Sequence, residues 1–138
     1  MRARQRNWRR RDAGASAVEM AIVLPLLALL VFGIIDFGRA LNAQIQISQA
    51  AREGVRLAAL AGGGAYSTAD VNARVAQAAP NPGFGGTPAS VSPAPVMCPT
   101  NAPATAAATV NVVYNFKGIF FLSGGTILEQ RAVMRCGG

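Results

Sequence analysis

Residues 13–35 read AGASAVEMAIVLPLLALLVFGII, and Glu19 is the only charged side chain among them. A helix of this length rises about 35 Å, which is enough to cross a hydrocarbon core of roughly 30 Å. In water such an apolar helix would need protein on all sides, and the rest of the chain is too short and too rich in glycine and proline to surround it. The stretch therefore predicts a transmembrane helix, which we place at residues 15–35.

Positive charge is concentrated before this apolar stretch. The chain has 13 basic and 6 acidic residues, and residues 1–12 hold six arginines and one aspartate. Because basic flanks stay in the cytoplasm, the pattern predicts a cytoplasmic leader at 1–14 and a C-terminal region outside the cytoplasmic membrane. An arginine run with Trp8 as its only aromatic residue is weak evidence for nucleic-acid binding, so no nucleic-acid partner is expected.

A cleaved secretory signal is the main alternative for an apolar N-terminal stretch. Such a signal has an apolar region of about 7–15 residues followed by a small-x-small cleavage site. Here the apolar run is longer, and the nearest such triplet after it, Gly38–Ala40, contains Arg39. These features favour a span that stays attached to the chain.

Glu19 lies inside the apolar stretch, where a charged side chain costs about 2.5–3.5 kcal/mol at the helix centre and less near an interface. One interpretation is that its carboxylate extends to the cytoplasmic interface, and the other is that it meets a cation from a neighbouring molecule. The surrounding sequence, RRRDAGASAVE at 9–19, resembles a type IV prepilin junction. In that class a membrane peptidase cuts after the glycine of a basic leader, and a glutamate is the fifth residue of the mature chain.

The resemblance places the processing site between Gly14 and Ala15 and makes Glu19 the fifth mature residue. Cleavage would create an α-amino group at Ala15, which is a cation at neutral pH if its pKa is near the reference value of about 7.7–8.0. In a staggered filament this amine can neutralise Glu19 of the next subunit, so Glu19 is expected to set the register between neighbours. Pro25 removes a helical hydrogen bond, which predicts a helix kink near residues 21–25.

Residues 14–27, 32–39 and 50–56 resemble the TadE-like family, which are pilin-like proteins of the tight-adherence (Tad/Flp) pilus and secretion machinery. Met20 departs from the pattern, since many relatives have an aromatic residue after the glutamate. The resemblance implies a pseudopilin that serves as a structural or assembly subunit and is a substrate of a prepilin peptidase. Its expected partners are the inner membrane, other pilin-like subunits and Tad assembly proteins, in a homo- or hetero-oligomer that can be part of an extracellular pilus.

Residues 36–61 continue the helix as an amphipathic extension, so that residues 15–61 form a rod of roughly 70 Å. Ala50, Gly54 and Ala58 form a row of small residues that permits close approach of another backbone. Over 45–61 the partner is expected to be this chain's own outer domain, with self-association as the alternative. The polar stripe of this helix consists of Arg39, Asn42, Gln46, Gln49, Glu53 and Arg56. Its apolar side consists of Phe37, Ala40, Leu41, Ala51, Val55, Ala58 and Ala59.

Residues 62–138 are expected to form an extracytoplasmic α+β domain with Gly/Pro-rich loops. Ser67–Asp70 offers a cap for a short helix that ends at Pro80, and residues 80–88 are expected to be an exposed loop. Strands are predicted at 89–92 (or longer, to Cys98), at 109–116 and at 126–135. Prolines confine the first of these strands to an edge of the sheet. Alternation is predicted to place Val110, Val112, Tyr114 and Phe116 on one face of the second strand, and Leu128, Ala132 and Met134 on one face of the third.

The predicted fold class is therefore α+β and pilin-like, with a long N-terminal helix and a small antiparallel three-stranded sheet. The apolar patch Ile119–Leu122 lies between the last two strands. We expect it in the core, and contact with the membrane surface or with a partner is the alternative.

Cys98 and Cys136 are the two cysteines, and outside the cytoplasm thiols usually pair, so a disulfide is expected. Unpaired or intermolecular cysteines are the alternative. The chain has no histidine, which excludes Ser–His and Cys–His nucleophile pairs, and two cysteines cannot complete a zinc site. No catalytic residue, metal or cofactor is expected, and the protein is not expected to be an enzyme. An unprocessed single-pass periplasmic scaffold and a small periplasmic binding module remain as alternatives.

Overall fold

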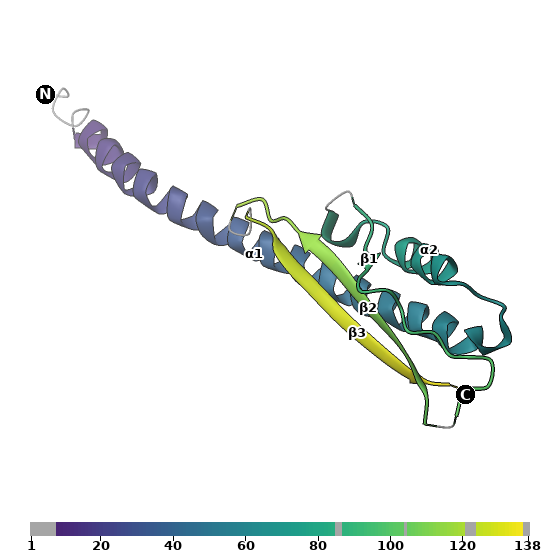
Figure 1. The fold of residues 1–138 in the computed structure, drawn as a ribbon. Helices are drawn as coiled ribbons and strands as arrows, with labels where there is room; N and C mark the ends of the chain where they lie inside the picture. The colour runs from purple at the N-terminus through teal and green to yellow at the C-terminus, as the bar shows by residue number, and fades with distance from the viewer. Residues whose placement is uncertain (1–7, 85–86, 104, 121–123, 137–138) are drawn as a thin grey trace, which may run out of the picture. The chain divides into compact units, whose positions relative to one another are not determined.

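The computed structural model describes residues 8–84, 87–103, 105–120 and 124–136, with side chains from residue 14 onward. The chain divides into two compact units, Met1–Ile35, here called the inner unit, and Asp36–Gly138, here called the outer unit. The described residues of the first unit belong to helix α1, and the second contains the rest of α1, a second helix and a sheet (Figure 1). The predicted α+β arrangement of one long apolar helix and a small antiparallel sheet is confirmed.

Helix α1 spans Trp8–Leu60, so it begins earlier than the predicted residue 15 and ends one residue before the predicted residue 61. Arginine is a good helix former, and no proline interrupts the segment before Gly14, which explains the early start. Pro25 lies within the helix. A short 3-10 turn, η1 (Ala61–Gly63), follows, and Gly64 ends it with a φ of 74°.

The outer part of α1 buries a row of mostly small side chains, and this row is rotated from the predicted apolar side. Phe37 and Leu41, which belong to the apolar side but lie before residue 45, are 64% and 45% exposed. Small side chains let the sheet and the second helix approach α1 closely, whereas the large ones would hold them apart. The buried row consists of Asp36, Ala43, Ile47, Ala50, Ala51, Gly54, Val55 and Ala58.

Helix α2 spans Thr68–Ala78 and begins with the predicted cap. The side chain of Ser67 accepts a hydrogen bond from the amide of Asp70, and a carboxylate oxygen of Asp70 accepts one from the amide of Ser67 at 2.7 Å. Val71 and Val75 are fully buried. A Cβ built on Gly54 of α1 would lie 2.7 Å from Val75 Cγ2 and 3.3 Å from Val110 Cγ1. The row of small residues therefore packs on other elements of the outer unit. This agrees with the expectation that the helix over 45–61 packs on the chain's own outer domain.

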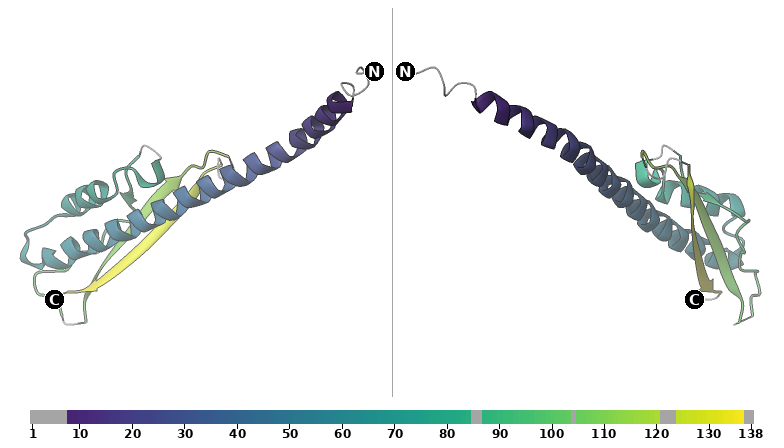
Figure 2. Two further views of the ribbon diagram at one scale, coloured as in Figure 1. Left: turned by 180° about the vertical axis from the view of Figure 1, so that it is seen from behind. Right: turned by 90° about the vertical axis from the view of Figure 1, so that its left-hand side faces the viewer.

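The sheet is antiparallel with the order β1–β2–β3, where β1 is Ser90–Val91, β2 is Ala107–Phe116 and β3 is Thr126–Arg135 (Figures 1 and 2). Phe116 pairs with Thr126 at one end of the β2–β3 ladder, and Ala107 pairs with Arg135 at the other. Prolines shorten β1, and an isolated bridge between Val96 and Thr109 continues its pairing with β2.

The predicted face of β2 is buried, but that of β3 is only partly so. Val110, Val112, Tyr114 and Phe116 are all at most 2% exposed. Leu128 and Ala132 pack against the core. Met134, on the same face of the strand, is 40% exposed. β3 is an edge strand of the sheet.

Two further predictions are corrected in the loops. Residues 80–88 were expected to be an exposed loop, but they contain a 3-10 turn, η2 (Pro82–Phe84), in which Pro82 and Gly83 are buried. Gly83 has a φ of 60°, and a Cβ at this position would lie 2.8 Å from the ring of Phe116. Glycine therefore allows the turn to contact the core.

The apolar patch between β2 and β3 was expected in the core, but Ile119 and Phe120 are 58% and 52% exposed. Phe121 and Leu122 lie outside the described residues. The turn that begins after β2 leaves these side chains on the surface because Phe116 already fills the end of the core.

Candidate processing and assembly site

Gly14, Ala15 and Glu19 all lie on the first unit's part of α1, and all three are exposed. A Cβ built on Gly14 would have no atom within 4 Å outside its own helix and neighbours. The structure thus leaves the segment around the predicted junction open to another molecule. It also places the Gly14–Ala15 peptide bond inside a helix, six residues after the helix begins at Trp8.

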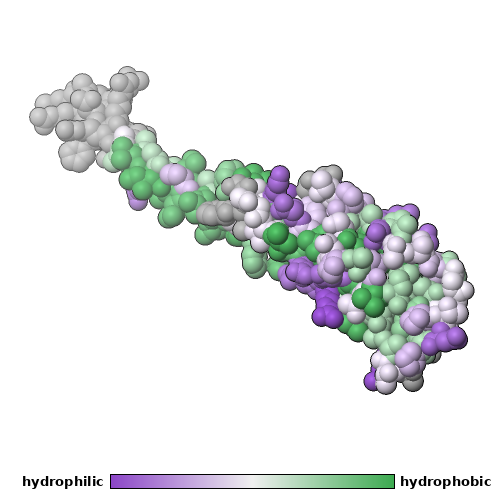
Figure 3. Space-filling view, viewed as in Figure 1, coloured by the Kyte–Doolittle hydropathy of each residue, from purple (hydrophilic) through white to green (hydrophobic). Residues whose placement is uncertain are grey.

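The surface around Glu19 is almost entirely apolar. The helix from Gly14 onward is long and apolar enough to cross a membrane, and none of its most apolar window of 18 residues is buried. Figure 3 shows this segment as a largely green rod after the grey N-terminal residues. A bare apolar surface of this length requires lipid or the helices of other proteins around it. Its large exposed side chains are Val18, Met20, Ile22, Val23, Leu24, Leu26, Leu27, Leu29, Leu30, Val31, Phe32, Ile34 and Ile35.

The carboxylate of Glu19 has no ion-pair partner among the side chains that the structure describes. An ionised carboxylate on such a surface is costly unless it reaches water or a cation. The geometry of one chain is therefore compatible with either predicted role of Glu19, at the interface or against a neighbour. Pro25 lies six residues further along the same helix and is also exposed.

A second polar cluster lies at the start of the outer unit, and the sequence analysis did not identify its role. Asp36 is 1% exposed, and its two carboxylate oxygens accept hydrogen bonds from the amides of Ile119 and Phe120, each at 2.9 Å. The guanidinium of Arg39 lies 3.8 Å from the carboxylate of Asp36. It also donates two hydrogen bonds to the carbonyl of Gly83, at 2.8 and 3.2 Å.

This cluster ties three distant parts of the outer unit together: the first turn of its helix, η2 and the turn after β2. Arg39 also lies over the ring of Phe116, 5.7 Å from its centroid. The sequence indicates only the pairing of Asp36 with Arg39. Asp36 directly follows the apolar run, and residues three positions apart lie on the same side of a helix. The partners, at sequence separations of 44 and 83 residues, have no such signal.

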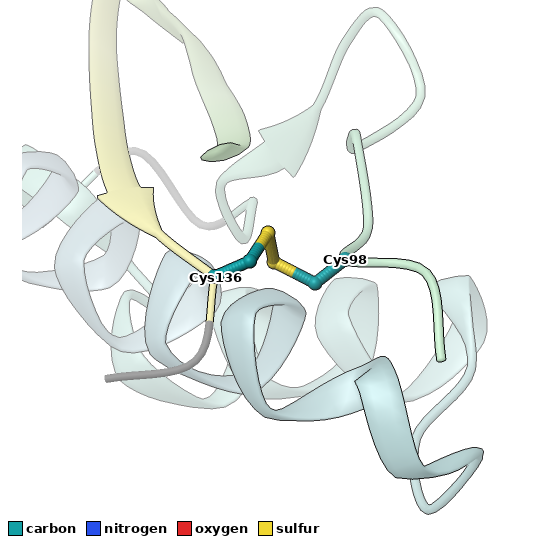
Figure 4. The surroundings of a disulfide bond; sticks show 2 residues. All are labelled: Cys98 and Cys136. Carbon is teal, nitrogen blue, oxygen red and sulfur yellow. A yellow bond between two sulfur atoms is a disulfide. The ribbon is translucent and has the colours of Figure 1, made fainter. Parts of the chain in front are cut away.

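The structure joins Cys98 and Cys136 in a disulfide with a Cα–Cα distance of 5.7 Å (Figure 4). The amide of Cys98 donates to the carbonyl of Ala58 in the last turns of α1, at 3.1 Å, and the amide of Cys136 donates to the carbonyl of Ala106, at 3.0 Å. The bridge therefore fastens the end of β3 to a loop that is itself bonded to α1.

Within the described residues, no group of three or more Cys, Asp and Glu side chains is placed to hold a metal ion. The shallow hollows on the outer unit hold few charged groups. The one beside α1 is lined by Leu41, Gln44, Ile45, Ser48, Gln49, Arg52 and Gln130. The described part of the chain thus concentrates its unusual chemistry on α1 and at Asp36.

A comparison with protein-family models matches residues 14–56 to the family described as TadE-like protein. Searches of curated proteins and of solved structures gave no match. The matched segment begins at Gly14 and includes Glu19, the apolar part of α1 and the Asp36–Arg39 pair. Residues 14–56 therefore carry the signature of the TadE-like family, and the chain fits a membrane subunit related to the Tad pilus.

Proposed function

We propose that the protein is a membrane-anchored TadE-like pseudopilin that acts as a structural or assembly subunit of a Tad-type pilus apparatus. The observation that carries this proposal is the family match over 14–56, which includes the exposed apolar part of α1 before Asp36 with its single carboxylate, Glu19. The outer unit offers a disulfide and a small packed core, and its described residues hold no group of three or more Cys, Asp and Glu side chains placed to bind a metal ion. A structural role suits that composition better than a catalytic one.

We propose that the anchor lies in the bacterial inner membrane with its arginine-rich end in the cytoplasm. Six arginines precede the apolar part of α1, whereas the other flank carries Asp36 and Arg39 in contact with each other. Basic flanks are retained on the cytoplasmic side. The disulfide of the outer unit agrees with an oxidising compartment such as the periplasm.

A prepilin peptidase is proposed to hydrolyse the Gly14–Ala15 bond, leaving a carboxylate on Gly14 and an ammonium group on Ala15. Glycine has a low helix propensity, costing about 1 kcal/mol relative to alanine, and lies near the N-terminal end of α1. The helix can therefore open locally at this point and present the bond to the peptidase.

The new ammonium group is proposed to neutralise Glu19 of a neighbouring pilin-like subunit. A unit charge pair at 4 Å contributes about 4 kcal/mol at an effective dielectric constant of 20. This is comparable with the cost of about 2.5–3.5 kcal/mol of placing a charged residue at the centre of a membrane helix. Pairing between chains would thus offset the insertion cost and fix one axial position of one helix against the next.

The test of processing is mass spectrometry of the protein isolated from its own membrane. We expect loss of residues 1–14 in the wild type and retention of the leader in Gly14→Ala. Gly38→Ala is the matched control, because both glycines lie on α1 with no atom within 4 Å of the added Cβ. An intact leader in the wild type, isolated from cells with a working pilus, would refute processing.

The test of register uses Glu19→Leu, for which we expect normal membrane insertion but weaker recovery of pilin-like partners on co-isolation. Glu53→Gln is a control, because it removes a carboxylate from the same helix outside the apolar stretch. Equal partner recovery from Glu19→Leu and the wild type would show that Glu19 only extends to the interface.

One observation favours a second candidate, an unprocessed single-pass periplasmic scaffold. The helix runs through the Gly14–Ala15 bond from Trp8, so the bond is not presented in an extended segment. The same mass measurement separates the two candidates, because the scaffold retains its full N-terminal sequence.

A further inference from the structure

Two large apolar side chains are exposed on the turn that follows β2. Ile119 is 58% and Phe120 is 52% exposed, although the outer unit has a core beside them. Lys117, two residues before Ile119, is also exposed. Adjacent exposed apolar side chains next to a cation are typical of segments that lie in a membrane interface.

The backbone of this turn is held by Asp36 rather than left free. Each carboxylate oxygen of Asp36 accepts one amide hydrogen bond at 2.9 Å, from Ile119 and from Phe120. Burial of a carboxylate is costly without such charge-assisted bonds, and Asp36 is only 1% exposed. The contact therefore specifies where the two apolar residues lie along α1.

Asp36 directly follows Ile35, the last residue of the apolar run. One residue of helix rises about 1.5 Å, and the headgroup layer on each side of a bilayer is roughly 5–8 Å thick. A turn bonded to Asp36 thus lies at the depth where α1 leaves the hydrocarbon. This depth follows from the covalent link between Ile35 and Asp36.

We propose that Ile119 and Phe120 insert into the periplasmic interface of the bilayer, and that Asp36 is the positioning residue that holds them there. The proposal rests on the membrane anchoring given under the proposed function. It adds a second lipid contact, 83 residues from the anchor in sequence. Such a contact restricts how the outer unit tilts and rotates above the membrane, while Lys117 lies near lipid phosphates.

The experiment uses full-length protein reconstituted in phosphatidylcholine vesicles whose acyl chains carry bromine near the headgroup, which quenches tryptophan fluorescence. The chain has one tryptophan, so Trp8→Phe removes the background signal. Single reporters are then added by Phe120→Trp in the turn, Phe32→Trp in the apolar part of α1 and Tyr66→Trp after η1. Tyr66 is 41% exposed and serves as the matched aromatic control.

We expect strong quenching and a blue-shifted emission for the Phe32→Trp and Phe120→Trp reporters and neither effect for Tyr66→Trp. Adding Asp36→Asn removes one of the two acceptors, which should reduce quenching of the Phe120→Trp reporter while leaving the Phe32→Trp reporter quenched. Retained disulfide and cooperative unfolding of this variant would show that the outer unit is still folded.

Quenching at Phe32→Trp without quenching at Phe120→Trp overturns this inference and leaves the membrane anchor intact. In that case the two exposed side chains belong to a protein contact. Absence of quenching at both positions refutes the anchor and the inference together. Equal quenching at Phe120→Trp with and without Asp36→Asn would refute the positioning role of Asp36.

Discussion

The two units of the protein use the same helix in opposite ways. Between Gly14 and Ile35, α1 is apolar, and its large side chains are exposed. From Asp36 to Leu60 it buries one row of small residues and exposes Phe37 and Leu41. Hydrophobicity alone therefore does not decide which face of a helix is covered. In the outer unit the covered face is the one where small side chains let a sheet and a second helix approach.

The comparison also separates two sources of order. The outer unit has a packed core, a disulfide and polar contacts among its own residues, so its stability is a property of this chain. The described part of the inner unit has a helix whose apolar surface is available to lipid or to other subunits. Substitutions in the outer unit should thus change folding, and substitutions in the inner unit should change assembly.

The largest expected effect is loss of the disulfide in Cys98→Ser/Cys136→Ser. A bridge over 38 residues contributes about 4 kcal/mol in the chain-entropy model. We expect the thermal unfolding midpoint of the outer unit, followed by circular dichroism in detergent, to fall sharply, while the helical signal of the apolar segment persists. An unchanged midpoint would show that the core alone stabilises this unit.

A smaller effect with opposite signs is expected for two glycines of α1. The Cβ of Gly54→Ala would lie 2.7 Å from Val75 Cγ2, so overpacking should lower the free energy of unfolding by about 1–3 kcal/mol. Gly38→Ala meets no atom within 4 Å and should raise it by up to about 1 kcal/mol through helix propensity. Chemical denaturation of both variants measures the difference, and equal effects would contradict the close packing at Gly54.

The smallest effect concerns the cap of α2 and its pH dependence. The carboxylate of Asp70 accepts hydrogen bonds from the amide of Ser67, which has the larger effect, and from its hydroxyl. Both hold the pKa of Asp70 below its ordinary value of 3.8. A lowered folded-state pKa stabilises the fold above the unfolded-state value, and this contribution is lost as the pH falls through the folded-state pKa. Asp70→Asn should therefore be slightly less stable than the wild type near pH 6, and the difference should shrink below about pH 3.8.

Denaturation of the wild type and Asp70→Asn at the two pH values provides the measurement. Because Asp70 is exposed, the effect should be small and confined to the outer unit. A difference that stays constant with pH would mean that the carboxylate charge does not stabilise the cap.

Local patterns predicted the elements well. The apolar run required a long helix, the serine–aspartate cap marked the start of α2, and strict alternation identified β2 and its buried face. The pairing of the two cysteines also followed, since only one intramolecular pairing exists. The helix and strand predictions depend on residues that are close in sequence, and the cysteine pair depends on there being two cysteines. A single sequence contains both kinds of information.

The candidate site was predictable in the inner unit and only partly so in the outer one. Gly14, Ala15 and Glu19 were identified by the resemblance of residues 9–19 to a type IV prepilin junction, and the family match covers them. Their roles remain predictions. The link from Asp36 to Ile119 and Phe120 was missed because it joins residues 83 and 84 positions apart. The predicted burial of residues 119–120 was wrong, since Ile119 and Phe120 are exposed and their amides bond to Asp36, a contact that no local pattern indicates.

The sequence by itself determined that the chain carries an apolar helix long enough for a bilayer, a carboxylate five residues after Gly14 and the strands of a small sheet. Periodicity, length and the order of charges are local properties of the sequence, so they can be read from it without knowing any tertiary contact. Tertiary structure alone decided which face of α1 is buried, that Gly83 is enclosed and that Asp36 clamps a distant turn. Those outcomes depend on which shapes fit together in a small core, a choice that is made only when distant segments meet.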